Sequence, residues 1–475
     1  MGSTESMHRD AQGLNMSGTS EAVAAYDTAL GHLVRFQAEV VVVIADARAA
    51  GAACAMVELL SAYLSLMSTE QSGVADAHDA LRNLGEEAHD LTQREHEHLA
   101  AANLWLLGDM AGAARLLEDL TLRHPRDLLA LEVGHQIDFF TGHATALRDR
   151  IGRALYAWGP DDANRGFVQG MYAFGLEECN LYALSEEMAE QAVQANSEDV
   201  WGIHALVHTY EMQGRTAEGL RFLQAREPQW RTGNFLNVHN SWHNALFLLE
   251  GDDVEGALAI YDAVLHHDGS EDIALELVDA SSLLWRLHLE DSPVDDRWQP
   301  LADAWTRIMV PGYYPFNDVH ATMAFVGAGR LSLAQELVTS LERAVGEAGD
   351  DSTGRFMTRA VGLPVCRSLV SFGRGDDTGF LDHYLPVREN LHRFGGSHAQ
   401  RDAMERTAVT AAIRAGRSDL ARALLSERLG VRERSSYTWG RLAQVLDADG
   451  DEAGASAATS RAKAIAYEVA TALTS

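Results

Sequence analysis

Apolar residues recur at helical spacing through nearly the whole chain, whereas the alternating pattern of strands is scarce. Alanine, leucine and glutamate, which favour helices, fill most of these segments. The segments are separated by short turns in which a glycine follows an apolar helix and a polar residue comes next. This pattern occurs in LWLLGDMAGAARLLEDL (104–120), FFTGHATALRDRI (139–151), EMQGRTAEGLRFL (211–223), LLEGDDVEGALAIY (248–261), VGAGRLSLAQELV (326–338) and IRAGRSDLARALL (413–425). The sequence therefore predicts an all-α protein built from helical hairpins.

The spacing of the glycine turns indicates a structural repeat. Gly108 and Gly142 lie 34 residues apart, and Gly214 and Gly251 lie 37 residues apart, near the period of about 34 residues in tetratricopeptide repeats. Glycine can adopt the left-handed conformation that ends a helix, and small residues in the next helix allow two helices to approach closely. We therefore predict an α-α superhelix of tetratricopeptide-like hairpins, with an irregular helical bundle as the alternative.

Composition and charge restrict the class of protein. The chain has 475 residues, of which 47% are hydrophobic and 23% charged, so it can bury a large core. Its formal net charge of -31 makes an acidic surface that repels phosphate backbones and anionic lipid headgroups. We therefore expect neither nucleic acid nor a membrane as a partner. Three scattered cysteines are too few for a disulfide framework, which fits a reducing compartment.

The ends and the interior of the chain indicate its organisation. The first twenty residues, MGSTESMHRDAQGLNMSGTS, are polar and lack the apolar run of a secretory signal. We expect residues 1–20 to form a disordered arm. Because no proline-rich or serine-rich linker interrupts the remainder, we expect 21–475 to be a single domain. The most apolar run, 40–67, contains charged residues that argue against a membrane span, and we expect the protein in the cytoplasm.

Two predicted helices carry pairs of histidines at the same register. HALVHTYEMQG (204–214) and HNSWHNALFLLEG (239–251) each contain two histidines four residues apart. The offset between the pairs is 35 residues, so His204 aligns with His239 and His208 with His243. Because the first helices of tetratricopeptide hairpins line the concave surface, we expect the two pairs to lie side by side, with Glu211 on the face of His204 and His208.

The histidines allow three interpretations. They can be half-buried helix residues whose ring nitrogens bond to neighbouring polar groups. Imidazoles at i and i+4 can also converge on zinc or another divalent metal, with His208 and His243 as the candidate ligands. Histidine beside glutamate can equally act as a general acid and base without a metal. The HExxH motif of zinc proteases is absent from the sequence. The candidate catalytic residues are His204, His208, Glu211, His239 and His243.

Further polar residues are candidates for substrate binding, namely Glu178, Asp318, His320, His398 and Arg401. Arg401 could bind a substrate carboxylate through two parallel hydrogen bonds, although surface ion pairs are the alternative. Asp318 could be a helix N-cap. Glu178 lies among aromatic residues, where a buried carboxyl group has a raised pKa. We interpret Asp279 as a residue of a packing network rather than of the site.

Five motifs occur in order along the chain, namely WGIHALVHTYEMQG, NVHNSWHNALFLLEGDDVEGALAIYD, VDASSLLWRLHLE, FNDVHATMAF and GGSHAQRD. In these motifs the sequence resembles the tetratricopeptide repeat protein 38 family. The resemblance extends from about Ala24 to about Leu446. It implies a helical repeat fold in a single chain, and it implies no particular chemistry.

Two functions follow from these patterns. In the first, the concave face holds a pocket for a small molecule, and the histidines catalyse acid-base or metal-assisted hydrolysis, hydration or elimination. This would make the protein a hydrolase or lyase, with a divalent metal such as zinc as the candidate cofactor. In the second, the protein is a non-catalytic scaffold that binds a peptide or protein partner. The predicted first helices carry histidine, tryptophan and tyrosine rather than the lysine, arginine and asparagine typical of peptide-binding grooves, which favours the pocket.

Overall fold

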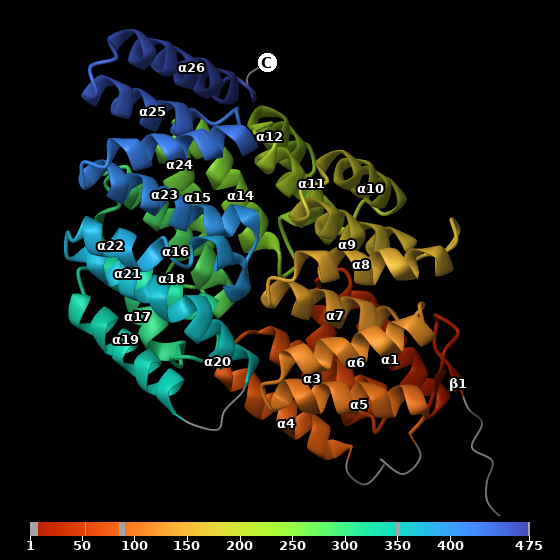
Figure 1. Cartoon of the computed structure of the whole chain (residues 1–475). Helices are drawn as coiled ribbons and strands as arrows, with labels where there is room; N and C mark the ends of the chain where they lie inside the picture. Colours follow the sequence, from red (N-terminus) through yellow and green to blue (C-terminus); the bar gives the residue numbers. More distant parts are fainter. Residues whose placement is uncertain (1–7, 53, 85–90, 348–351, 474–475) are drawn as a thin grey trace, which may run out of the picture. The chain divides into compact units, whose positions relative to one another are not determined.

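The structure is a computed structural model that describes residues 8–52, 54–84, 91–347 and 352–473 (Figure 1). Nearly all of the regular structure in these residues is helical. The two strands found among them, β1 (His8–Arg9) and β2 (Asn15–Met16), pair antiparallel in one short hairpin. The prediction of an all-α protein made of tetratricopeptide-like hairpins is confirmed.

The chain divides into two compact units. The first comprises Met1–Ala205, Thr232–Leu236 and Gly349–Phe356, and the second comprises Leu206–Arg231, Asn237–Ala348 and Met357–Ser475. The division falls inside one helix, between Ala205 and Leu206. We expected a single domain over 21–475 because no linker is visible in the sequence. Because the division lies within a continuous helix, a single domain stays a prediction.

The helices of the first unit follow one another in hairpins. They are α1 (Ser20–Leu33), α2 (Glu39–Ala49), α3 (Ala55–Met67), α4 (Gln71–Asn83), α5 (Gln93–Leu106), α6 (Met110–Arg123), α7 (Leu128–Phe140), α8 (Ala144–Ala154), the 3-10 turn η1 (Leu155–Ala157), α9 (Arg165–Glu178) and α10 (Tyr182–Ala195). Helix α11 (Val200–Met212) begins in the first unit and ends in the second, whereas α20 (Thr353–Met357) lies in the first unit except for its last residue.

The second unit continues the series. Its helices are α12 (Thr216–Ala225), α13 (Glu227–Trp230), α14 (Asn237–Glu250), α15 (Val254–Ile260), α16 (Ala274–Leu289), α17 (Trp298–Ile308), α18 (Pro315–Gly327), α19 (Leu331–Gly346), α21 (Leu363–Gly373), α22 (Asp377–Tyr384), α23 (His398–Arg414), α24 (Ser418–Val431), α25 (Ser436–Ala448) and α26 (Glu452–Ala470). Shorter turns are η2 (Tyr261–Leu265), η3 (Asp295–Arg297), η4 (Thr358–Gly362) and η5 (Arg388–Phe394).

All six expected glycine turns connect consecutive helices, and five of them place a glycine in the left-handed region. These glycines are Gly108, Gly142, Gly214, Gly329 and Gly416. Gly251 departs from the expectation, because Asp252 takes the left-handed conformation there, with a φ of 60°. A Cβ atom at Gly251 would lie 2.9 Å from Val469 Cγ1 of α26. This glycine therefore permits the close approach of another helix rather than the turn.

The two helices of a hairpin are buried to different extents. Helix α19 buries Ala334, Leu337, Val338 and Leu341, which form a single apolar stripe. Its partner α18 is buried along its whole length from Pro315 to Val326. The first helix of this hairpin is thus enclosed, and the polar side chains that it carries lie in the interior.

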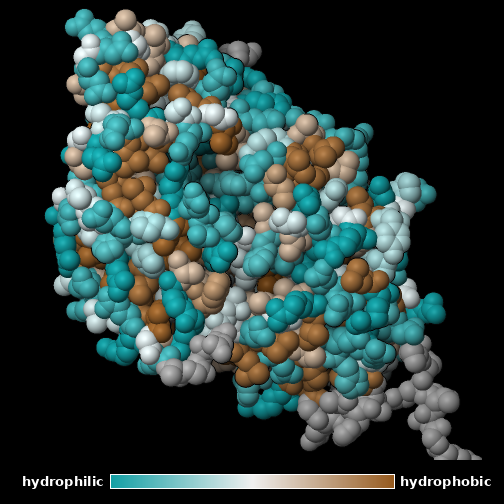
Figure 2. Space-filling model, in the orientation of Figure 1, coloured by the Kyte–Doolittle hydropathy of each residue, from teal (hydrophilic) through white to brown (hydrophobic). Residues whose placement is uncertain are grey.

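On the face shown in Figure 2, hydrophilic side chains cover most of the surface and hydrophobic ones occur in separate groups. The large exposed hydrophobic residues of the described chain include Val42, Tyr156 and Tyr467, which lie on different helices or turns. Among the described residues, no helix has both the length and the apolar character needed to cross a bilayer.

Much of the segment that we expected to be a loose arm is ordered in the structure. Residues 1–7 lie outside the described residues, but His8 to Met16 form the β1–β2 hairpin. Arg94 Nη1 donates to Asp10 Oδ2 at 2.7 Å, and Arg94 Nε donates to Asp127 Oδ2 at 2.6 Å. All three side chains are buried. One guanidinium group thus ties the hairpin to α5 and to the start of α7, a contact between residues 84 positions apart that local polarity does not indicate.

Replacing Arg94 with methionine is expected to destabilise the first unit strongly. The variant leaves two carboxylates buried without their counter-charge, which costs roughly 3–5 kcal/mol. Thermal unfolding followed by circular dichroism should show a clear decrease in Tm. The matched control is Arg82→Met, because Arg82 forms an exposed pair with Asp79 and its loss should cost less than about 1 kcal/mol. Equal effects of the two variants would contradict a structural role for the buried pair.

Candidate functional site

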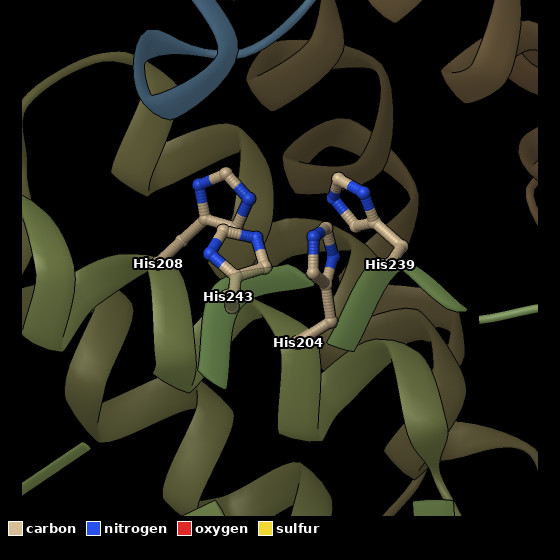
Figure 3. Close-up of side chains that lie close together, drawn as sticks. All are labelled: His204, His208, His239 and His243. Carbon is tan, nitrogen blue, oxygen red and sulfur yellow. The ribbon is translucent and has the colours of Figure 1, made fainter. Parts of the chain in front are cut away.

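The histidine pairs of α11 and α14 lie together in the structure (Figure 3). Nitrogen atoms of His204, His208, His239 and His243 lie within 4.8 Å of one another. His208, His239 and His243 belong to the second unit, and His204 precedes His208 by one turn of the same continuous helix. His208 and His243 are fully buried, whereas the side chain of His239 is 16% exposed. The cluster is therefore interior, with one partly accessible edge.

The rings of the three histidines in the second unit contact one another. The ring centres of His208 and His243 are 4.4 Å apart, and those of His239 and His243 are 4.9 Å apart, in both cases edge to face. His239 also stacks on Trp242 at 5.2 Å. The i, i+4 spacing within α14 and the common register of α11 and α14 account for this convergence.

Two carboxylates hold two of the imidazoles. His243 Nδ1 lies 2.7 Å from Glu211 Oε2, and His239 Nδ1 lies 2.8 Å from Asp279 Oδ2. An ionised carboxylate only accepts hydrogen bonds, and with an ionised partner each imidazole donates its Nδ1–H and keeps Nε2 as the nitrogen with a lone pair. Carboxylates in this position fix the tautomer and the orientation of histidines that bind metals.

Asp279 takes part in the cluster, although we interpreted it from the sequence as a packing residue. It lies on α16, 40 positions after His239, and its carboxyl group is buried. Local patterns give no sign of such a contact. The available signal was the repeat itself, because the first helix of one hairpin packs beside that of the next.

The side chain of Glu211, on α11, is hydrogen-bonded to His243 of the neighbouring helix α14. Its Oε2 receives the His243 hydrogen bond, and its Oε1 lies 3.7 Å from Arg432 Nη1. Burial raises the pKa of Glu211, while Arg432 and Arg286 act in the opposite direction. The acid thus connects the histidines to a group of buried arginines.

Burial lowers the pKa of both His208 and His243 well below the usual value for histidine. The neighbouring imidazoles act in the same direction, His243 and His239 on His208, and His239 on His243. A second positive charge in a cluster of this kind would be costly. The cluster accordingly favours neutral imidazoles, the form that binds metals.

Asp318 and His320 make local contacts on α18. Gly312 N donates to Asp318 Oδ2 at 3.1 Å, and burial raises the pKa of Asp318 to about 8. His320 Nδ1 donates to the carbonyl oxygen of Phe316 at 2.8 Å, and burial lowers the pKa of His320 to about 4. These contacts give both side chains a structural role, and their role in substrate binding stays a prediction.

The remaining substrate-binding candidates lie in different units. Glu178 is a buried residue at the end of α9 in the first unit. His398 and Arg401 lie in the first turn of α23 in the second unit, where the Ser397 side chain caps the helix. Arg401 Nη1 donates to the carbonyl oxygen of Gly396. Both His398 and Arg401 line a cavity of about 400 Å³ within the second unit.

Sequence analysis did not identify the buried arginines of the second unit. Asp402 accepts hydrogen bonds from Arg406 Nε at 2.8 Å and from Arg428 Nη1 at 2.6 Å, and its Oδ2 lies 3.5 Å from Arg432 Nη2. Arg286, on α16, is only 2% exposed. In the sequence these arginines resemble the solvated charges of amphipathic helices, and only the stacking of hairpins shows that they are enclosed.

No known protein-family profile matches the chain. Among solved structures, the chain is similar to a human IFIT1 dimer with PPP-AAAA, with 14% identity over 97% of this chain and 98% of that chain and a TM-score of 0.39. It is also similar to the Cut9–Hcn1 hetero-tetramer of the APC/C, with 11% identity over 80% of each chain and a TM-score of 0.25. The chemistry of the present chain has to be argued from its own residues.

The raised pKa of Asp318 predicts a pH dependence of stability. Folded Asp318 keeps its proton up to about pH 8, whereas the unfolded chain loses it near pH 3.9. Unfolding therefore releases a proton between these values, and this contribution to stability decreases as the pH rises from about 4 to about 8, by at most about 1.4 kcal/mol per pH unit.

Asp318→Asn removes this titration and keeps an acceptor for Gly312 N. The unfolding free energy of the variant relative to the wild type should therefore increase between pH 5 and pH 8 in urea titrations. Asp303→Asn is the control, because Asp303 forms an exposed pair with Arg330 whose hydrogen bond lowers its pKa. A constant difference between Asp318→Asn and the wild type would show that Asp318 is ionised at neutral pH.

Proposed function

We propose that the histidine cluster of α11 and α14 binds a divalent metal ion, zinc or a similar transition metal, and that the protein is a metal-dependent hydrolase or lyase acting on a small molecule. The observation that carries the proposal is the convergence of imidazole nitrogens within 4.8 Å of one another, together with the carboxylates that hold His239 and His243. Histidine nitrogens of this kind are common ligands of zinc, copper, iron and nickel.

The donor set fits such an ion. Zinc–nitrogen bonds are about 2.0–2.1 Å long in tetrahedral sites, which brings ligand nitrogens to roughly 3.4 Å from one another. The candidate ligand nitrogens of the cluster lie within 4.8 Å of one another, so a bound ion would draw them closer together. His208, His239 and His243 would supply three ligands, and His204 a fourth nitrogen nearby. Catalytic zinc sites have three protein ligands and one position open to water or substrate.

The chain's own residues support catalysis at such a centre. A bound divalent ion supplies Lewis acidity, which polarises a carbonyl or phosphoryl oxygen and makes water more acidic. Glu211 and Asp279 orient the imidazoles and hold their Nδ1 protons. The burial of His208 and His243 limits competition from bulk water. These features favour hydrolysis, hydration or elimination, the reactions that we expected from the sequence.

The five ordered motifs also lead us to propose that the chain is a relative of the tetratricopeptide repeat protein 38 family. Four of them begin on α11, α16, α18 and just before α23, and the remaining one spans α14 and α15. They therefore follow the helices that supply the histidine cluster and its partners. This proposal concerns ancestry and adds no activity of its own.

Metal analysis of the protein purified without an affinity tag tests the proposal. We expect about one equivalent of zinc or a similar ion per chain by mass spectrometry, retained on dialysis and removed by a chelator. His208→Ala and His243→Ala should lose the metal while keeping the helical circular dichroism spectrum. His78→Ala is the control, because this histidine is exposed on α4. Absence of bound metal and of rebinding would leave the non-catalytic scaffold as the better description.

The two carboxylates can be tested separately from the ligands. Asp279→Asn and Glu211→Gln keep all four histidines but weaken the acceptors of the Nδ1–H groups. Loss of such partners lowers metal affinity about 10–100-fold in known sites. Competition with a chromogenic chelator measures the change, and Glu218→Gln serves as the control because Glu218 forms a half-exposed pair with Arg215. Unchanged affinity in both variants would show that the carboxylates only support packing.

A further inference from the structure

Arg286, in the interior of the second unit, donates hydrogen bonds to neutral groups. Arg286 Nη1 donates to the carbonyl oxygen of Ser282 at 3.0 Å and to its hydroxyl group, and Arg286 Nη2 donates to the carbonyl oxygen of Ala399 at 2.6 Å. The guanidinium group lies over the ring of Trp242, 5.4 Å from its centre. Burial lowers the pKa of Arg286 to about 10, which still leaves it charged at neutral pH.

Three other arginines near Arg286 share three carboxylates. Asp402 contacts Arg406, Arg428 and Arg432. Glu250 Oε1 pairs with Arg406 at 3.1 Å, and its Oε2 accepts from the backbone N–H of Ser436. Glu211, the third carboxylate, lies 3.7 Å from Arg432 and also receives the hydrogen bond of His243.

Among these seven residues there is one more guanidinium than there are carboxylates, whereas the nearby Arg388 pairs with two carboxylates, Glu405 and Glu427. The guanidinium groups belong to Arg286, Arg406, Arg428 and Arg432, and the carboxylates to Glu211, Glu250 and Asp402. A buried charge without a counter-charge costs several kcal/mol. A divalent ion on the histidine cluster would increase the positive charge further. An anion bound nearby would offset this cost.

A cavity adjoins this group. It has a volume of about 400 Å³, and its lining includes Arg401, Arg428 and Arg432. Met212, one turn after His208 on α11, also lines it, as does His398. The cavity therefore reaches the same face of α11 as the histidine cluster. The charges of His398 and Arg401 lower the pKa of His208, as expected if the cavity lies close to the histidine cluster.

Three carboxylates of the cavity wall, Asp402, Glu405 and Glu427, are engaged with arginines, and Glu389 also lines the cavity. Glu405 and Glu427 both pair with Arg388, at 2.8 Å and 2.7 Å, and Asp402 is shared as described above. By contrast, the ion pairs of Arg432 are long, at 3.5 Å and 3.7 Å. Guanidinium groups bind carboxylates and phosphates through paired N–H groups. An anion in the cavity can therefore compete for the N–H groups of Arg432 more easily than for those of Arg388.

We propose that this cavity binds an oxyanionic group of the substrate, a carboxylate or a phosphate, through Arg401 and Arg432, and so places the rest of the substrate toward His208. The inference rests on the proposed function for the reaction, but the anion site itself requires no metal. The substrate on this inference is a small anion, although the chain as a whole has a net negative charge.

Titration calorimetry with inorganic phosphate and with acetate tests the inference on the full chain, both after chelator treatment and after loading with zinc. We expect one of the two probes to bind the chelator-treated protein, and the preferred probe identifies the group. Arg401→Gln and Arg432→Lys should each weaken binding roughly tenfold, the equivalent of one charge-assisted hydrogen bond. Arg432→Lys keeps the positive charge beside Asp402 and Glu211, so that the fold is preserved. Arg401→Gln leaves the contacts between Asp402 and its arginines unchanged. Arg417→Gln, at an exposed turn, should have no effect.

The outcomes separate the two proposals. Binding that depends on these arginines in a chain without metal supports the anion site even if the metal proposal fails. Binding only to the zinc-loaded protein, unchanged in both arginine variants, means that the probe contacts the metal, which overturns the anion site and supports the metal centre. Absence of binding by either probe in both forms also overturns the inference.

Discussion

The enclosure of the first helices is the constraint on which the second unit depends. Helix α18 is buried from Pro315 to Val326, and most of α16 is buried as well. An ionisable side chain on such a helix has no water to solvate it, so it needs a partner from a neighbouring helix. The contacts of His243 with Glu211 and of His239 with Asp279 meet this need. The stacking of hairpins that forms the core therefore also assembles the candidate site.

The parts of this arrangement that depend on short-range patterns could be predicted from the sequence. The turns at Gly108 and Gly214 follow from the preference of glycine for the left-handed region, and the register of His208 and His243 follows from the repeat length. Contacts between helices depend on how the hairpins stack, which no local pattern encodes. The contact of Asp279 with His239 could therefore not be foreseen, and neither could the close approach of Gly251, within its turn, to Val469.

Net charge illustrates a second limit of sequence reasoning. The value of -31 describes the chain as a whole and is dominated by exposed acidic residues. One region of the second unit is nevertheless rich in arginine, because Arg286 is 2% exposed and Arg432 lies 3.5 Å from Asp402. An average over the chain cannot show this, since burial rather than number decides how strongly a charge acts. For the same reason, the contact of Arg94 with Asp10 in the β1–β2 hairpin could not be inferred from the polarity of that segment.

Burying the histidine cluster and its carboxylates costs free energy, and this cost favours a functional role for the cluster over a purely structural one. Apolar side chains of similar size would fill the same space without carboxylate partners. Instead, Glu211 and Asp279 are themselves buried in order to hold Nδ1 of His243 and His239. Fixing this tautomer on adjacent rings assigns the lone pair of each to Nε2. In the proposed metal centre, these two acceptor nitrogens, on rings whose centres are 4.9 Å apart, would share the cation, and nearby arginines would bind the accompanying anion.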